Sequence, residues 1–103
     1  MANYLLAYKG GGMASSDKER AEQMAAWGKW FGGLGAAVVD GGNPCGTSKT
    51  VAKDGNVKDG GSGITGYSVL KAESLEAAVK LAKGCPLLKA GGSVEVYETI
   101  NAM

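Results

Sequence analysis

The sequence predicts an α+β domain in which a strand-helix-strand unit occurs twice around an antiparallel sheet. Three observations predict it. Apolar residues alternate or concentrate in four short stretches, as in strands. Two other stretches carry apolar residues at helical spacing behind good N-terminal caps, and glycine-rich segments separate these stretches. A chain of 103 residues fits a single domain, so we expect one domain over residues 1–103.

The first strand is expected over residues 3–9. Tyr4, Leu6 and Tyr8 alternate there with residues that are also apolar. Apolar residues on both sides indicate a strand that is covered on both faces. Glycines 10–12 end it.

A capping box predicts the start of the first helix. The hydroxyl of Ser16 can accept a hydrogen bond from the third helical N–H while the carboxylate of Glu19 reaches back. An apolar stripe follows at helical spacing and consists of Met24, Trp27, Phe31 and Leu34. Trp30 lies beside this stripe, and the glycines at 32, 33 and 35 stop the helix near residue 34.

The middle of the chain begins with a short β-branched strand over Ala36–Asp40 and a turn after it. Residues 45–63 are polar and rich in glycine. Thr50-Val51 and Val57 leave two alternatives for them, a small hairpin or an extended loop.

The second half repeats the order of the first. Thr65–Ala72 alternates as a third strand, Ser74 is a good N-cap for a helix that ends before Pro86, and Ser93–Ile100 alternates as the last strand. The whole order, β-α-β-β-α-β, is ferredoxin-like and places both helices on one face of the sheet. Because the strands are apolar on both sides, the other face needs a cover. We expect a second copy in a symmetric homodimer, with the loop over residues 45–63 as the less apolar alternative.

Composition narrows the function classes. The net charge is only +1, so nothing indicates a basic nucleic-acid surface. No apolar stretch is long enough for a membrane span. Two isolated cysteines suit a reducing compartment, and we expect a cytoplasmic protein. There is no histidine and no acidic cluster with metal-ligand spacing, so no metal and no cofactor are expected.

Several motifs resemble the YCII-related, or DGPF-like, family over nearly the whole chain. They are residues 39–44 (Val-Asp-Gly-Gly-Asn-Pro), 65–68 (Thr-Gly-Tyr-Ser) and 91–96 (Gly-Gly-Ser-Val-Glu-Val). The resemblance implies a dimeric α/β barrel, in which two ferredoxin-like units pair back to back. Some members resemble enzymes with a helix histidine and an aspartate after the second strand. Asp40 matches that aspartate, whereas the histidine has no counterpart here.

Asp40 is the candidate catalytic residue. A carboxylate replaces histidine as a general base when burial raises its pKa. The competing interpretation is that Asp40 only caps the turn that follows it, because Asp side chains readily bond nearby backbone amides.

Four residues are candidates for ligand binding. Trp27 and Trp30 are three apart on the helix and can wall an apolar pocket, and Tyr67 can reach such a cleft with its hydroxyl. Lys49 can place a positive charge at its mouth. For each, the alternative is ordinary packing or, for Lys49, a solvated loop side chain.

These residues support two main hypotheses. The first is a dimeric, non-catalytic module that binds or senses a small molecule. The second is a small enzyme that catalyses isomerisation of, or proton transfer on, a small aromatic or carbonyl compound, with Asp40 as the base. A protein-interaction unit that docks through the glycine-rich loop is a third.

Overall fold

The computed structural model describes residues 1–11 and 15–101. Its elements are, in order, β1 (Ala2–Lys9), α1 (Asp17–Leu34), β2 (Val38–Asp40), β3 (Lys49–Val51), β4 (Val57–Asp59), β5 (Ile64–Ala72), α2 (Leu75–Ala82) and β6 (Ser93–Glu98). Short 3-10 turns, η1 (Gly35–Ala37) and η2 (Pro86–Ala90), precede β2 and β6. Gly12, part of the turn expected at residues 10–12, lies outside the described residues.

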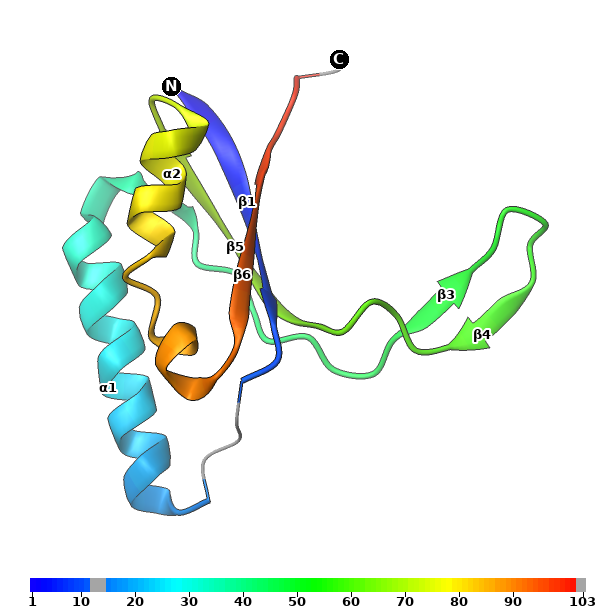
Figure 1. Cartoon of the computed structure of the whole chain (residues 1–103), viewed down its shortest axis with the longest axis horizontal. Coiled ribbons are helices and arrows are strands. Elements are labelled where there is room, and N and C mark those ends of the chain that lie inside the picture. The colour runs from blue at the N-terminus through cyan, green and yellow to red at the C-terminus, as the bar shows by residue number, and fades with distance from the viewer. Residues whose placement is uncertain (12–14, 102–103) are drawn as a thin grey trace.

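The main sheet has the strand order β2-β5-β1-β6, and every neighbouring pair is antiparallel. Helices α1 and α2 lie together on one side of it (Figure 1). This arrangement confirms the predicted α+β, ferredoxin-like fold. The second strand is shorter than expected, because residues 35–37 form a 3-10 turn and not the start of the strand.

The core lies between the sheet and the helices. Tyr4, Leu6 and Tyr8 alternate onto the helix face of β1, and each is at most 6% exposed. Leu70 of β5 and two alanines of α2 pack against them. Full burial of a leucine-sized side chain contributes about 1.5–3 kcal/mol relative to leaving it exposed, so Leu6 and Leu70 each stabilise the fold by about that much.

Both helices begin at the predicted serines. The hydroxyl of Ser16 accepts a hydrogen bond from the Glu19 N–H at 3.1 Å, and that of Ser74 accepts one from the Ala77 N–H at 3.1 Å. The reciprocal half of the capping box differs from the prediction, because the Glu19 carboxylate accepts from the N–H and hydroxyl of Ser15. These two bonds lower the pKa of Glu19.

The apolar stripe of α1 is shorter than the sequence predicts. Met24 is 70% exposed, whereas Trp27 and Leu34 are partly buried against the core. The side of α1 that contacts the core therefore begins one turn later than expected.

The middle region forms a hairpin, which was one of the two alternatives left open by the sequence. Strands β3 and β4 pair only with each other and make a separate two-stranded sheet. The hairpin projects beyond the side of the main sheet that faces away from the helices (Figure 1). The radius of gyration is 15.1 Å, compared with about 13 Å for a compact domain of this length. The projecting hairpin accounts for this excess.

The second face of the main sheet has an apolar centre. Leu5 of β1 pairs with Val69 of β5 on one side and with Tyr97 of β6 on the other. Leu5 and Val69 are partly exposed, and Tyr97 is 50% exposed.

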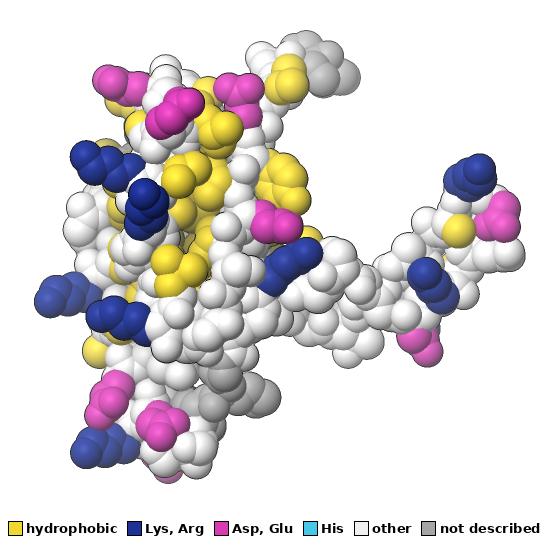
Figure 2. Space-filling view, viewed as in Figure 1, with side chains coloured by type: hydrophobic (Ala, Val, Ile, Leu, Met, Phe, Trp, Pro, Cys, Tyr) yellow, Lys and Arg dark blue, Asp and Glu magenta, His cyan; other side chains and the backbone are white. Residues whose placement is uncertain are grey.

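On the surface seen in Figure 2, hydrophobic side chains gather over the body, while charged side chains of both signs lie around it and on the hairpin.

No helix in the described part of the chain is long and apolar enough to cross a membrane. Cys45, which is exposed, and Cys85, which is buried, are both free thiols.

Candidate functional site

The segment after β2 is held against β5 by backbone hydrogen bonds. The Tyr67 N–H donates to the Asn43 carbonyl at 3.3 Å, and the Cys45 N–H donates to the Thr65 carbonyl at 3.0 Å. Gly66 makes this approach possible, because a Cβ at that position would lie 3.3 Å from the Asn43 carbonyl oxygen and from the Tyr8 ring. Residues 41–44 therefore form a fixed ledge that continues β2 along the edge of β5.

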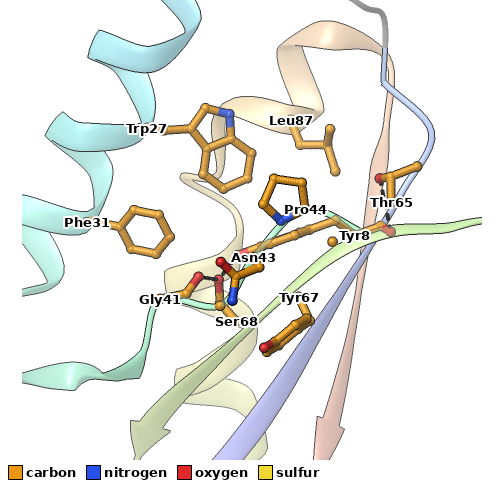
Figure 3. A pocket seen from close by; sticks show the side chains of 12 residues that line it. Tyr8, Trp27, Phe31, Gly41, Asn43, Pro44, Thr65, Tyr67, Ser68 and Leu87 are labelled. Atoms are coloured by element: carbon orange, nitrogen blue, oxygen red, sulfur yellow. Dashed lines mark hydrogen bonds between the residues drawn. The ribbon is translucent and has the colours of Figure 1, made fainter. Parts of the chain in front are cut away.

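A pocket of about 350 Å³ opens between this ledge and α1. Trp27 and Phe31 face it from α1, Leu87 from η2, and Asn43 and Pro44 from the ledge (Figure 3). This volume is at the lower end of the range for small-molecule sites, which are mostly apolar with a few convergent polar groups.

The α1 wall of the pocket is aromatic. The Tyr8 and Trp27 ring centroids lie 5.1 Å apart with an interplanar angle of 76°, an edge-to-face contact. The Trp27 and Phe31 centroids lie 5.8 Å apart at 33°. Such contacts stabilise ring orientations, so the wall is preformed, and its flat faces suit a planar apolar ligand.

The polar part of the pocket consists of two linked hydrogen bonds, of which the first is buried and the second partly buried. The Tyr8 hydroxyl donates to the Ser68 hydroxyl at 2.7 Å, and the Ser68 hydroxyl donates to the Gly41 carbonyl at 2.7 Å. Tyr8 is 6% exposed and Ser68 is fully buried. Burial raises the pKa of Tyr8 to about 12, a rise that the bond to Ser68 opposes and the nearby Cys85 increases.

Two of the residues predicted to bind ligand line this pocket. Trp27 forms its aromatic wall, and Tyr67 lines its edge at the ledge. In β5 the buried residues alternate with Tyr67, which is partly buried and pairs with Ala7 of β1. The Tyr67 backbone, which pairs with the ledge, brings the residue to the pocket edge, whereas its ring points away from Trp27 and Phe31 (Figure 3).

The other predicted residues lie elsewhere. Trp30 packs between the helices, where its indole N–H donates to the Leu81 carbonyl at 3.2 Å. Lys49 lies on the hairpin and pairs with Asp59 at 2.7 Å. Neither contributes to the pocket lining.

Asp40 is exposed and lies outside the pocket, next to the lining residue Gly41. Its carboxylate accepts a hydrogen bond from the Gly42 N–H at 2.8 Å. This is the turn-capping contact expected if Asp40 has no catalytic role.

Tyr8 and Ser68 were not predicted as site residues. Both belong to predicted strands, and nothing in an alternating strand marks one hydroxyl as lining a pocket. The one available signal was Ser68 itself, a small polar residue on the buried side of a strand, since such a group needs a partner. Within the described residues, no group of three or more His, Cys, Asp and Glu side chains is arranged to hold a metal ion.

A family model described as the YCII-related domain matches residues 1–102. Among solved structures, the chain is similar to 5-chloro-2-hydroxyhydroquinone dehydrochlorinase from Burkholderia phenoliruptrix AC1100, in complex with 2,5-dihydroxybenzoquinone. The TM-score is 0.59 at 21% identity, over 97% of this chain and 95% of that one. No curated protein matches the sequence. At this identity the structural likeness supports the fold.

Proposed function

The chain belongs to the family of YCII-related domains, and we propose that it is a homodimeric module that binds a small, planar, partly apolar molecule. The observation that carries the proposal is the pocket of about 350 Å³, with Trp27 and Phe31 as an aromatic wall and Tyr8 and Ser68 as its polar part. Preformed rings and a few fixed polar groups are the usual features of such a site.

The structural neighbour supports a ligand of this kind. Its bound 2,5-dihydroxybenzoquinone is a single flat ring with oxygen substituents. A ring of that size suits the pocket described here, so a monocyclic aromatic or quinone-like compound is the ligand class we propose.

The homodimer is part of the proposal because the second sheet face carries an apolar centre. Leu5, Val69 and Tyr97 lie side by side across three strands and remain partly exposed. A symmetric partner would bury them, and the hairpin projects on that same side (Figure 1). Sedimentation velocity tests this: the native chain is expected to sediment as a dimer and a Val69→Glu variant as a folded monomer. A monomeric native chain would refute it.

The cytoplasm remains the proposed location. The two free thiols are compatible with a reducing compartment.

Intrinsic tryptophan fluorescence tests ligand binding, because the two tryptophans lie differently. Trp27 lines the pocket, whereas Trp30 bonds to α2. We propose to titrate a library of monocyclic phenols, quinones and aromatic aldehydes into a Trp30→Phe variant, which keeps only Trp27. A saturable change in emission is expected for at least one compound class.

The matched control is Trp27→Phe, which keeps only Trp30. Its emission is expected to respond weakly, and its affinity is expected to fall because part of the aromatic wall is smaller. A library with no saturable response in either variant would contradict small-molecule binding and favour the protein-interaction hypothesis.

A second candidate function is a small enzyme for isomerisation or proton transfer, with Asp40 as base. What favours it is that Asp40 directly precedes Gly41 and Gly42, which line the pocket. For any compound that binds, turnover is followed by the change in its absorbance spectrum. Loss of turnover with retained affinity in Asp40→Asn would support the enzyme, whereas binding without turnover in the native chain supports the binding module.

A further inference from the structure

The direction of the hydrogen bonds behind the pocket is fixed by chemistry. A carbonyl oxygen only accepts, so the hydroxyl of Ser68 must donate its single proton to Gly41. The Ser68 oxygen is then free only to accept, so the Tyr8 hydroxyl must donate to it. Both bonds are 2.7 Å long, a favourable O–H···O distance.

These two hydrogen bonds engage the hydroxyl protons of both Tyr8 and Ser68. The oxygen of Tyr8 keeps lone pairs, whereas its proton faces Ser68. A molecule in the pocket therefore meets a hydrogen-bond acceptor at Tyr8 and no donor from this pair. We propose that the pocket selects a neutral aromatic molecule with a hydroxyl donor, a phenol or hydroquinone, over its ether, aldehyde or quinone counterpart. The inference rests on the proposed function and sharpens its ligand class.

The lack of charge in the described pocket lining favours a neutral ligand. Among the described residues that line the pocket, none carries a charged side chain. An ionised phenol or a carboxylate would lose its hydration there without an opposite charge to compensate, and this costs several kcal/mol or more. With a pKa of about 12, the Tyr8 hydroxyl is protonated at neutral pH and can still donate to Ser68.

The other polar groups of the lining do not reverse this preference. The indole nitrogen of Trp27 lies on the side of its ring away from Ser68, and the Tyr67 ring points away from Trp27 (Figure 3). The Asn43 side chain stands on the exposed ledge and offers both a donor and an acceptor. The hydroxyl of Thr65 lies within 3.3 Å of the Tyr8 carbonyl and 3.4 Å of the Gly10 carbonyl, to which it donates. The buried acceptor at Tyr8 is thus the polar group that discriminates most, because an unsatisfied group costs more when it is buried.

The test compares three ligands of nearly equal shape. These are 4-methylphenol, 4-methylanisole, in which a methyl group replaces the hydroxyl proton, and 4-methylbenzaldehyde, which has only an acceptor. Their dissociation constants are measured by direct titration, followed by Trp27 emission, in the Trp30→Phe variant at neutral pH. The phenol is expected to bind about tenfold more tightly than either of the others, the effect of one good hydrogen bond.

Two variants change the hydrogen-bonding pair in different ways. Tyr8→Phe removes the acceptor, so the preference for the phenol is expected to fall to about one. Ser68→Ala leaves the Tyr8 proton without its partner and makes it available to a ligand. The aldehyde is therefore expected to gain affinity about as much as one hydrogen bond allows, roughly five- to tenfold.

The control is Tyr97→Phe, which removes a tyrosine hydroxyl from the opposite face of the sheet, where it donates to Glu95 at 2.8 Å. It is expected to keep the native preference, and circular dichroism checks that every variant folds. Equal affinity of the phenol and its methyl ether in the native pocket would overturn the selectivity and leave the proposed function standing. Tighter binding of the aldehyde would overturn it too. Failure of all three to bind would overturn the selectivity, and the proposed function would fall only if the library titration also gave no saturable response.

Discussion

The hairpin and the body contain polar contacts of the same length in opposite surroundings. Lys49 and Asp59 pair at 2.7 Å on the hairpin, with 63% and 90% of their side chains exposed. Tyr8 and Ser68 also lie 2.7 Å apart, but inside the body. An exposed ion pair contributes about 0–1 kcal/mol. Loss of one partner of a buried bond leaves an unsatisfied group that costs about 1–3 kcal/mol. The solvent exposure of the two partners, and not the distance between them, therefore determines how much each contact contributes to stability.

The largest expected effect comes from removing apolar volume in the two regions. Leu70→Ala removes a fully buried side chain from the core, whereas Val51→Ala changes a hairpin residue that is 67% exposed. We expect a loss of about 2–5 kcal/mol in the free energy of unfolding for Leu70→Ala and a change within about 0.5 kcal/mol for Val51→Ala. Urea denaturation followed by far-ultraviolet circular dichroism measures both. Equal losses would show that the hairpin is packed against something in solution.

The sequence predicted the body much better than the hairpin, for a physical reason. Residues of β1 and β5 alternate because one face of the sheet is buried, and Ser74 caps α2 through a local bond, so both signals are visible in a few consecutive residues. The hairpin buries little, so its residues carry no alternation to read, and two alternatives remained for 45–63.

The site was harder to predict than the fold because it depends on contacts distant in sequence. Tyr8 and Ser68 are 60 residues apart in the chain, and their pairing follows from the register of β1 against β5, which no local pattern gives. Trp27 was proposed because two tryptophans three residues apart on a helix can wall a pocket, whereas its place on the apolar stripe favoured ordinary core packing. Lys49 was proposed from its loop position alone, and the pairing of β3 with β4 places it away from the pocket.

A second comparison concerns two glycines with positive φ angles. Gly42 has φ +74° and Gly55 has φ +88°. A Cβ at Gly42 would overlap the backbone carbonyl of Tyr67, whereas a Cβ at Gly55 meets open space at the hairpin tip. Gly55→Ala is expected to cost about 1–2 kcal/mol, the backbone penalty alone. Gly42→Ala adds a clash with the Tyr67 backbone and is expected to cost more than about 2 kcal/mol.

Thermal unfolding of the two alanine variants measures this difference, since 1 kcal/mol shifts the midpoint by roughly 4–8 °C in a domain of this size. Gly42→Ala is also expected to weaken ligand binding, because Gly42 lines the pocket and its N–H donates to the Asp40 carboxylate that caps the turn. A Gly42→Ala midpoint no lower than that of Gly55→Ala would mean that the ledge moves freely, contrary to the fixed geometry described here.

The buried hydroxyl of Tyr8 predicts a pH dependence that the hairpin lacks. Its pKa rises from the ordinary 10.0 to about 12 in the folded chain. Folding favours the uncharged Tyr8 hydroxyl. The contribution of this hydroxyl to the free energy of unfolding is therefore fully present below about pH 10 and is lost as the pH rises toward 12. The loss amounts to at most about 1.4 kcal/mol per pH unit in that window.

Tyr4 and Tyr97 also have raised pKa values and contribute to the alkaline loss. The difference between the native chain and Tyr8→Phe therefore isolates Tyr8. We expect the free energy of unfolding of Tyr8→Phe to fall less steeply above pH 10, as measured by urea denaturation at several pH values. Parallel curves for the two proteins would mean that the Tyr8 hydroxyl ionises as readily when folded as when unfolded.

The smallest expected effect is that of the hairpin ion pair. Lys49→Ala, Asp59→Ala and the double variant form a cycle whose coupling energy isolates the contact between the two side chains. We expect a coupling below about 1 kcal/mol that declines further in 1 M salt, since the Debye length there is only about 3 Å and both side chains are solvated. A coupling of several kcal/mol that persists in high salt would mean that the pair is desolvated in solution. That result would make the hairpin part of an interface, as the proposed dimer allows, and would remove the contrast with the Tyr8–Ser68 pair.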